Sequence, residues 1–180
     1  MNASPVFLDR DGTLVVEKHY LSDPAEVSLE EGVVAALRVL RSHAHPLVVL
    51  SNQSGIGRGL FPASAAHAVN ARIDDLLRAG GVDILGWYIC PHAPAAGCDC
   101  RKPSPGLALR AAREHGLRLT GSFVIGDKQA DVLLADAIGA TGILVTTGQG
   151  AEAAEWAKAH AAPVFDSLGA AAEFVTEMGS

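Results

Sequence analysis

Short apolar runs alternate with helical patterns along the whole chain. Six runs are rich in β-branched residues and are bounded by glycine, proline or polar clusters, which is typical of buried strands. They cover residues 6–8, 46–50, 85–90, 123–125, 143–145 and 163–165. Between these runs the apolar residues return every three or four positions, as at Val33, Leu37 and Leu40, which predicts helices.

Further helices follow from the same spacing and from their end signals. Val69, Ile73, Leu76 and Leu77 form a second apolar stripe, and a last helix is expected over residues 167–177.

Glycines and one capping pair mark two more helices. Ser104 before Pro105 is typical of an N-cap followed by proline at the first helical position, and Gly116 is expected to end that helix. An apolar face from Leu134 to Ile138 is expected to end at Gly139.

The alternation of strand and helix predicts an α/β fold, a Rossmann-like parallel sheet with helices on both faces. Active sites in such sheets lie beyond the carboxyl ends of the strands. Five polar or turn-rich segments each follow a strand: residues 9–30, 51–61, 91–104, 126–131 and 146–150. We therefore expect function at that edge of the sheet.

Composition narrows the class of protein. A length of 180 residues predicts one domain over 1–180, and 49% apolar residues are enough for a real core. The net charge of -6, from 20 acidic and 14 basic residues, argues against a nucleic-acid partner but leaves room for a small anion in a local basic pocket. The sequence shows no signal peptide at its amino terminus and no apolar run long enough to span a membrane. A cytoplasmic protein without a membrane partner is therefore expected.

The first of the five segments carries two aspartates directly after a strand. Asp9 and Asp11 are two residues apart; Gly12 permits a sharp turn, and the Thr13 hydroxyl is expected to hydrogen-bond the loop closed. Paired carboxylates suit a divalent cation, or a nucleophile with an acid/base partner. The alternative is an ordinary charged turn.

The second segment, Ser51-Asn52-Gln53-Ser54-Gly-Ile-Gly-Arg58-Gly, offers a hydroxyl, backbone N–H groups and an arginine to an anion. Its spacing is neither that of a Walker loop nor that of a dinucleotide fingerprint. A flexible surface loop is an equally good interpretation of this segment alone.

The third segment holds all three cysteines. Cys90, His92, Cys98 and Cys100 supply four soft ligands, which predicts a closed, structural zinc site that staples a proline-rich loop. The alternative is buried free cysteines, but the polar, loop-like surroundings fit burial poorly. Zinc would also hold the following cations, Arg101 and Lys102, in the rigid placement that a phosphate-binding pair needs; a solvated charge pair is the alternative for these two.

The fourth segment places Asp127 directly after a strand and Asp131 at the start of a helix. The two aspartates could complete a cation site. The alternative is that Asp131 only interacts with the helix dipole, and the two interpretations are compatible.

Together these residues resemble the haloacid dehalogenase superfamily of phosphohydrolases, over the whole chain. The resemblance rests on four signatures: Asp9-x-Asp11-Gly-Thr, Ser51, Lys102 and Gly-Asp127-x3-Asp131. The string Cys-Asp-Cys-Arg-Lys-Pro and the zinc loop narrow it to the branch of heptose-bisphosphate and histidinol-phosphate phosphatases. Within this branch, the segment that begins at Asn52 resembles the heptose-bisphosphate phosphatases more than the histidinol-phosphate phosphatases.

The resemblance implies Mg²⁺-dependent hydrolysis of the 7-phosphate of D-glycero-D-manno-heptose 1,7-bisphosphate. Asp9 is expected to attack phosphorus and Asp11 to serve as acid and then base, while Ser51 and Lys102 hold phosphate oxygens. The Mg²⁺ ligands are expected to be Asp9, the Asp11 carbonyl and Asp127. The residues expected to line the substrate site are Glu17, Lys18, His19, Tyr20, Ser51, Asn52, Gln53, Ser54, Arg58, Arg101, Lys102 and Lys128.

No large insertion follows Asp11 or Ser51, so no large cap domain is expected, and the enzyme is expected to be a monomer. Hydrolysis of histidinol phosphate is the nearest alternative. A zinc-stabilised binding domain without catalysis is a more distant one, and phosphoryl transfer to an alcohol stays open.

Overall fold

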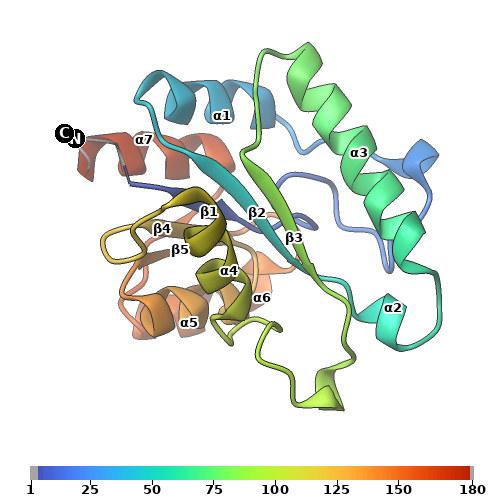
Figure 1. Cartoon of the computed structure of the whole chain (residues 1–180). Helices are drawn as coiled ribbons and strands as arrows, with labels where there is room; N and C mark the ends of the chain where they lie inside the picture. The colour runs from blue at the N-terminus through green and yellow to red at the C-terminus, as the bar shows by residue number, and fades with distance from the viewer. Residues whose placement is uncertain (1–3, 179–180) are drawn as a thin grey trace.

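The sheet confirms the predicted architecture. The computed structural model describes residues 4–178, in which six parallel strands lie in the order β3-β2-β1-β4-β5-β6 (Figure 1). Phe7 of the central strand pairs with Val48 on one side and Val124 on the other. The chain thus changes direction across the sheet beside β1, the place where α/β proteins bind ligands. The strands are β1 (Val6–Leu8), β2 (Leu47–Asn52), β3 (Gly86–Cys90), β4 (Phe123–Gly126), β5 (Thr141–Val145) and β6 (Val164–Phe165).

Helices cover both faces of the sheet (Figure 1). They are α1 (Val33–Ser42), α2 (Ser54–Gly57), α3 (Ala63–Ala79), α4 (Gly106–His115), α5 (Gln129–Ile138), α6 (Gly150–Ala159) and α7 (Leu168–Met178), with short 3₁₀ turns η1 (Pro24–Glu26) and η2 (Pro94–Ala96). Val6 and Leu8 point into a core cluster with α1, α3 and α7, whereas Phe7 points into a second one with α4 and α5. Successive residues of a strand face opposite sides, so the short apolar run of β1 fills both layers.

Some elements differ from the sequence-based expectation. Helix α6 was not predicted, because its buried positions are Gly150, Ala153 and Ala157, which leave no stripe of large apolar residues. The four-residue helix α2 lies within a segment expected to be a loop.

The predicted start of α4 is wrong in detail. The N-cap residue is Pro105, and no side chain caps the helix, so Ser104 does not have the expected role. Gly116 and Gly139 do end α4 and α5, with left-handed φ values of 65° and 69°. Strand β2 continues through Ser51 and Asn52, which were expected to lie beyond it.

The segments after β1 and β2 add no folded layer over the sheet edge. Residues 9–32 form turns with isolated bridges from Val15 to Asp11 and to Leu29, and residues 53–62 form α2 and its flanks. Within residues 4–178, no helix is long and apolar enough to cross a membrane. Residues 1–3, which belong to the amino-terminal segment for which no signal peptide was expected, lie outside the described residues. The single domain over 1–180 stays a prediction.

Candidate active site

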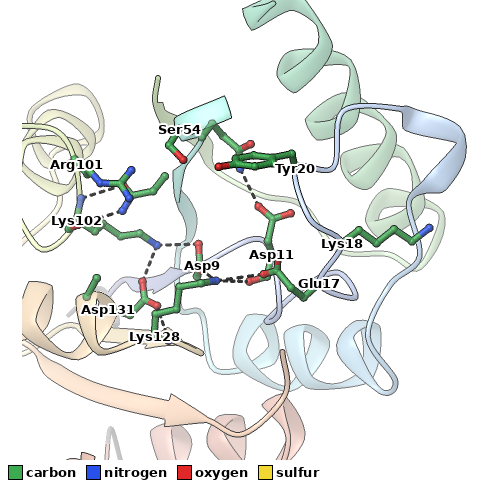
Figure 2. Close-up of a pocket in the computed structure, with 13 residues that line it drawn as sticks. Asp9, Asp11, Glu17, Lys18, Tyr20, Ser54, Arg101, Lys102, Lys128 and Asp131 are labelled. Atoms are coloured by element: carbon green, nitrogen blue, oxygen red, sulfur yellow. Dashed lines mark hydrogen bonds and ion pairs between the residues drawn. The ribbon is translucent and has the colours of Figure 1, made fainter. Parts of the chain in front are cut away.

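A buried ammonium group forms the centre of the site. Lys102 Nζ lies 2.8 Å from Asp9 Oδ1 and 2.6 Å from Asp131 Oδ1, and it donates a third hydrogen bond to the Leu50 carbonyl at 2.7 Å (Figure 2). Lys102, Asp9 and Asp131 are each at most 5% exposed. Three elements, β1, β2 and α5, therefore meet on one side chain that comes from the loop after β3.

The backbone of Lys102 is also fixed. The Asn52 side-chain amide donates to the Lys102 carbonyl at 3.1 Å, and its oxygen accepts from the Lys102 N–H at 3.0 Å. Asn52 was expected to bind substrate. Asn52 lines the cavity described below, but its side-chain oxygen and nitrogen both bind the backbone of Lys102. They hold residues 91–104, here called the lysine loop, against β2.

Charge neighbours set the ionisation of the carboxylates. Burial by itself raises the pKa of Asp9, but the positive charges of Lys102 and Lys128 outweigh it and hold that pKa below its ordinary value. Burial and the negative charge of Asp9 raise the pKa of Asp127 to about 7. Asp9 is thus held ionised, as a nucleophile requires, while Asp127 lacks a full counter-charge.

The ammonium of Lys128 lies where a cation fits. Its Nζ is 3.7 Å from Asp9 Oδ2, 3.3 Å from the Asp11 carbonyl, 3.0 Å from Asp127 Oδ1 and 3.3 Å from Glu17 Oε2. The first three are the oxygen groups expected to hold Mg²⁺. Hard oxygen donors around one point suit that ion, so the residues present fit a magnesium site.

The third carboxylate near this point is Asp131. One oxygen from each of Asp9, Asp127 and Asp131 can lie within 4.8 Å of the others. Asp131 also accepts from the Lys128 N–H at 3.1 Å as part of a capping box at the start of α5. The Asp131 carboxylate therefore lies both near the carboxylates expected to hold a cation and at the start of α5, and its role beside a cation stays a prediction.

The loop after β5 contacts the site through two hydrogen bonds. These contacts were not predicted from the sequence. The Gln149 N–H donates to Asp127 Oδ2 at 2.9 Å, and Thr147 Oγ1 donates to the Gly12 carbonyl at 2.6 Å. Gly12 has a φ of 82°, and a side chain there would collide with the Asp127 carboxylate. The position of this loop directly after a strand was the available signal.

Two side chains hold Asp11. Arg10 donates from Nε to Asp11 Oδ2 and from Nη2 to Oδ1, both at 3.0 Å. Gln53 Nε2 donates to Asp11 Oδ2 and to Ser51 Oγ, both at 2.8 Å. Arg10 was given no role from the sequence, because nothing in the pattern signals that an arginine in a polar loop is buried.

The expected role of Thr13 is wrong. Its hydroxyl is buried and has no hydrogen-bond partner among the described groups. Backbone bonds close the loop instead, from Leu14 N–H to the Arg10 carbonyl at 2.9 Å and from Gly12 N–H to the Val15 carbonyl at 2.8 Å.

A cavity of about 230 Å³ opens over these groups, at the carboxyl ends of the strands (Figure 2). It is lined by Asp9, Asp11, Glu17, Lys18, Tyr20, Asn52, Gln53, Ser54, Arg101, Lys102, Lys128, Ala130 and Asp131. Three residues expected to contact substrate do not line it: His19, Ser51 and Arg58. His19 packs edge-on against Tyr20, and Arg58 is exposed at the end of α2. Ser51 lies beneath the lining, buried and bonded to Gln53.

The four predicted zinc ligands form one cluster. Sγ of Cys100 lies 3.1 Å from that of Cys90 and 3.6 Å from that of Cys98, and 3.2 Å from His92 Nδ1. Ligands at the usual zinc–sulfur distance occupy the corners of a tetrahedron with edges of about 3.7 Å. The donor set and its spacing therefore fit zinc far better than three unrelated buried thiols.

This cluster lies in the first part of the lysine loop, with Cys90 directly before it, and precedes Lys102 in the sequence. Cys100 is followed at once by Arg101, whose guanidinium donates to the His92 carbonyl at 3.4 Å, and by Lys102. The Gly106 N–H donates to the Asp99 carbonyl at 2.9 Å and closes the loop onto α4. A metal at the cluster would fix the stretch that carries Lys102 to Asp9.

Comparisons with known proteins agree with this chemistry. A family model described as HAD-hydrolase-like matches residues 99–171. A protein of Photorhabdus laumondii is 41% identical, and the alignment covers 80% of this chain and 81% of that protein. A protein of Pseudomonas putida is 37% identical, and the alignment covers 93% of this chain and 96% of that protein. Both are named D-glycero-beta-D-manno-heptose-1,7-bisphosphate 7-phosphatase.

Solved structures of similar proteins share the whole fold. The D,D-heptose 1,7-bisphosphate phosphatase of B. bronchiseptica, crystallised with magnesium and phosphate, superposes with a TM-score of 0.89 at 30% identity, over 97% of this chain and 98% of its own. The corresponding phosphatase of Burkholderia thailandensis gives a TM-score of 0.72 at 27% identity, over 96% and 98%.

Zinc removal should loosen the lysine loop and leave the sheet intact, because the cluster lies within residues 90–100. We expect stoichiometric zinc in the purified protein by metal analysis. Stripping it, or the Cys98→Ser change, should speed hydrogen exchange over residues 91–104 well before the strands are affected. Absence of zinc, or a uniform rise in exchange across the sheet, would contradict the zinc interpretation.

The raised pKa of Asp127 gives the metal-free protein a definite pH dependence. The folded state holds this proton more tightly than the unfolded state, so the stabilising contribution is present below pH 4 and is lost as pH rises towards about 7. The Tm of the metal-free protein should fall across this window, and Asp127→Asn should remove the fall. Mg²⁺ at pH 7 should raise the Tm of the wild type and leave that of Asp127→Asn unchanged.

Asp75→Asn, an exposed carboxylate on α3, is the matched control and should behave as the wild type. An equal Mg²⁺ effect on Asp127→Asn and the wild type would rule out Asp127 as a ligand.

Proposed function

The chain belongs to the haloacid dehalogenase-like hydrolases and, within them, to the family of the heptose-1,7-bisphosphate 7-phosphatases, and we propose that it removes the 7-phosphate from D-glycero-D-manno-heptose 1,7-bisphosphate. The β anomer named for its relatives is the first candidate substrate. The observation that carries the proposal is Asp9, kept ionised by Lys102 at the end of β1 and open to the cavity.

Asp9 is the nucleophile. A carboxylate oxygen attacks phosphorus in line, the bond to the sugar oxygen breaks, and an aspartyl phosphate forms. Lys102 supports this step because its ammonium neutralises Asp9 and Asp131 together and fixes the direction of the Asp9 carboxylate. The three hydrogen bonds of its ammonium go to protein groups, so its expected contact with a phosphate oxygen requires one of them to be exchanged.

Asp11 is the acid and then the base. Its carboxyl gives a proton to the departing sugar oxygen, and afterwards takes one from the water that hydrolyses the aspartyl phosphate. Its position on the cavity wall, two residues beyond Asp9, supports this role. Arg10 and Gln53 hold it from the protein side.

The metals divide between chemistry and structure. Asp9, the Asp11 carbonyl and Asp127 would hold magnesium, which supplies positive charge against the repulsion between carboxylate and phosphate. Cys90, His92, Cys98 and Cys100 would hold zinc as a structural ion, since four protein ligands leave no open position.

Arg101, Lys18 and Lys128 make the cavity attractive to a substrate with two phosphates. All three line the cavity together with Asp9 and Asp11, and Lys128 Nζ lies 3.3 Å from Glu17 Oε2. Arg101 is the residue we assign to the distal 1-phosphate, and Tyr20 and Ser54 to the sugar between the two ends. His19 and Arg58 would reach substrate only from outside the cavity, and their contact stays a prediction.

The setting of the reaction rests on the sequence. We further propose that the protein acts on a phosphorylated sugar as a monomer in the cytoplasm, without a membrane partner; the net charge of -6 also disfavours a nucleic-acid partner.

Replacement of the nucleophile should abolish turnover. Asp9→Asn keeps the size of the side chain but removes the attacking charge, so kcat should fall by roughly 10⁴-fold or more while the far-UV spectrum stays unchanged. Phosphate release from heptose 1,7-bisphosphate measures the loss. Asp136→Asn, an exposed carboxylate on α5, is the control. Activity of Asp9→Asn near the wild-type level would exclude Asp9 as the nucleophile.

The substrate is tested by a direct comparison. We expect kcat/KM for heptose 1,7-bisphosphate to exceed that for histidinol phosphate by roughly 10²-fold or more, because only the former has a distal phosphate for Arg101. Arg101→Ala should shrink this ratio, and Arg113→Ala, an exposed arginine on α4, should not. A preference for histidinol phosphate would show that the protein is a histidinol-phosphate phosphatase. If neither substrate releases phosphate in the presence of magnesium, the protein would be a binding domain without catalysis.

A further inference from the structure

Arg10 carries a charge into a part of the protein that water does not reach. The side chain is 0% exposed and is the bulkiest of the fully buried side chains in residues 4–178. A buried ion pair rarely stabilises a fold more than well-packed apolar residues would, and a guanidinium without partners is costly. Packing alone therefore does not account for an arginine between Asp9 and Asp11.

The hydrogen bonds of this guanidinium divide between two partners. Nε and Nη2 form a fork on the two oxygens of Asp11, at 3.0 Å each. Nη1 donates to Asn70 Oδ1 at 2.9 Å. Asn70 is itself 6% exposed and lies on the buried face of α3, beside Val69 and Ile73. The long helix α3 thus supplies a fixed anchor for the side of the arginine that faces away from Asp11.

The fork fixes the plane of the Asp11 carboxyl, because both oxygens are bound at once by a rigid planar group. A lysine at this position would keep the charge but could offer only a point contact. Gln53 adds one bond to Oδ2 from the cavity side.

We propose that Arg10, anchored by Asn70, is a positioning residue that sets the orientation of Asp11 for proton transfer to the leaving group. The inference rests on the proposed function, in which Asp11 is the acid.

The chemistry of the first step provides a selective test. As the bond from Asp9 to phosphorus forms, the bond from phosphorus to the leaving oxygen breaks, and the electron pair of that bond goes to the leaving oxygen, which takes the proton of Asp11. A sugar alkoxide needs this proton, whereas p-nitrophenolate leaves without it. Misplacement of Asp11 should therefore slow the sugar phosphate and spare the aryl phosphate.

The quantity to measure is kcat/KM with saturating Mg²⁺. It includes only the steps up to departure of the leaving group, so the later use of Asp11 as a base does not affect it. Arg10→Lys should lower kcat/KM for heptose 1,7-bisphosphate by about 10²-fold and change that for p-nitrophenyl phosphate by less than about 3-fold. Asn70→Ala should give the same selectivity with a smaller loss, about 10-fold.

Two further variants serve as controls. Asp11→Asn should show the selectivity in full. Arg72→Lys changes an exposed arginine on α3, the helix that carries Asn70, and should leave kcat/KM for both substrates unchanged. An equal loss on both substrates, or no loss on either, would overturn the inference. If Arg10→Lys does not fold, as judged by its thermal melt, Asn70→Ala decides by the same two outcomes. A wild-type protein that hydrolyses neither substrate would instead overturn the proposed function, and the inference with it.

Discussion

One buried lysine links the fold to the chemistry. Lys102 pairs with Asp9 and Asp131, and all three side chains are largely buried, so each charge depends on the other two. Removal of one partner from a buried ion pair costs about 3–5 kcal/mol, because a charge is left without compensation. The three side chains start from the end of β1, the loop after β3 and the first turn of α5. The parallel sheet is what brings these distant segments to one edge.

This dependence gives a role to the Cys90–Cys100 loop, and the charges of the chain are distributed unevenly around the same site. A proline-rich loop without strand or long helix could not by itself hold an ammonium within 2.8 Å of a carboxylate, and the Cys90–Cys100 cluster and Asn52 provide the missing constraints. The chain is acidic with a net charge of -6, yet Arg101, Lys102 and Lys128 gather around the cavity. The attraction for an anion is local and does not follow from the net charge.

The sequence predicted what depends on strand order and residue type, and missed what depends on three-dimensional packing. Strand ends brought the expected carboxylates and Lys102 together because parallel strands share an edge, and four soft ligands within eleven residues could reach one point. Helix α6 was missed because small residues pack as well as large ones where α5 lies close. The burial of Arg10 and the contact of Gln149 with Asp127 arise from turns whose exact path no periodicity records.

Catalysis by the proposed route requires Asp9 to form a covalent bond to the phosphoryl group of a sugar bisphosphate. Asp11→Asn should slow hydrolysis of that bond because it removes the base, so the intermediate should accumulate with an activated aryl phosphate and Mg²⁺. Rapid acid quench, reduction of the acyl phosphate with borohydride and peptide mass spectrometry locate the modified residue. We predict homoserine at position 9 only in the sample that received substrate. Modification at another residue, or none with product still formed in a single turnover, would contradict it.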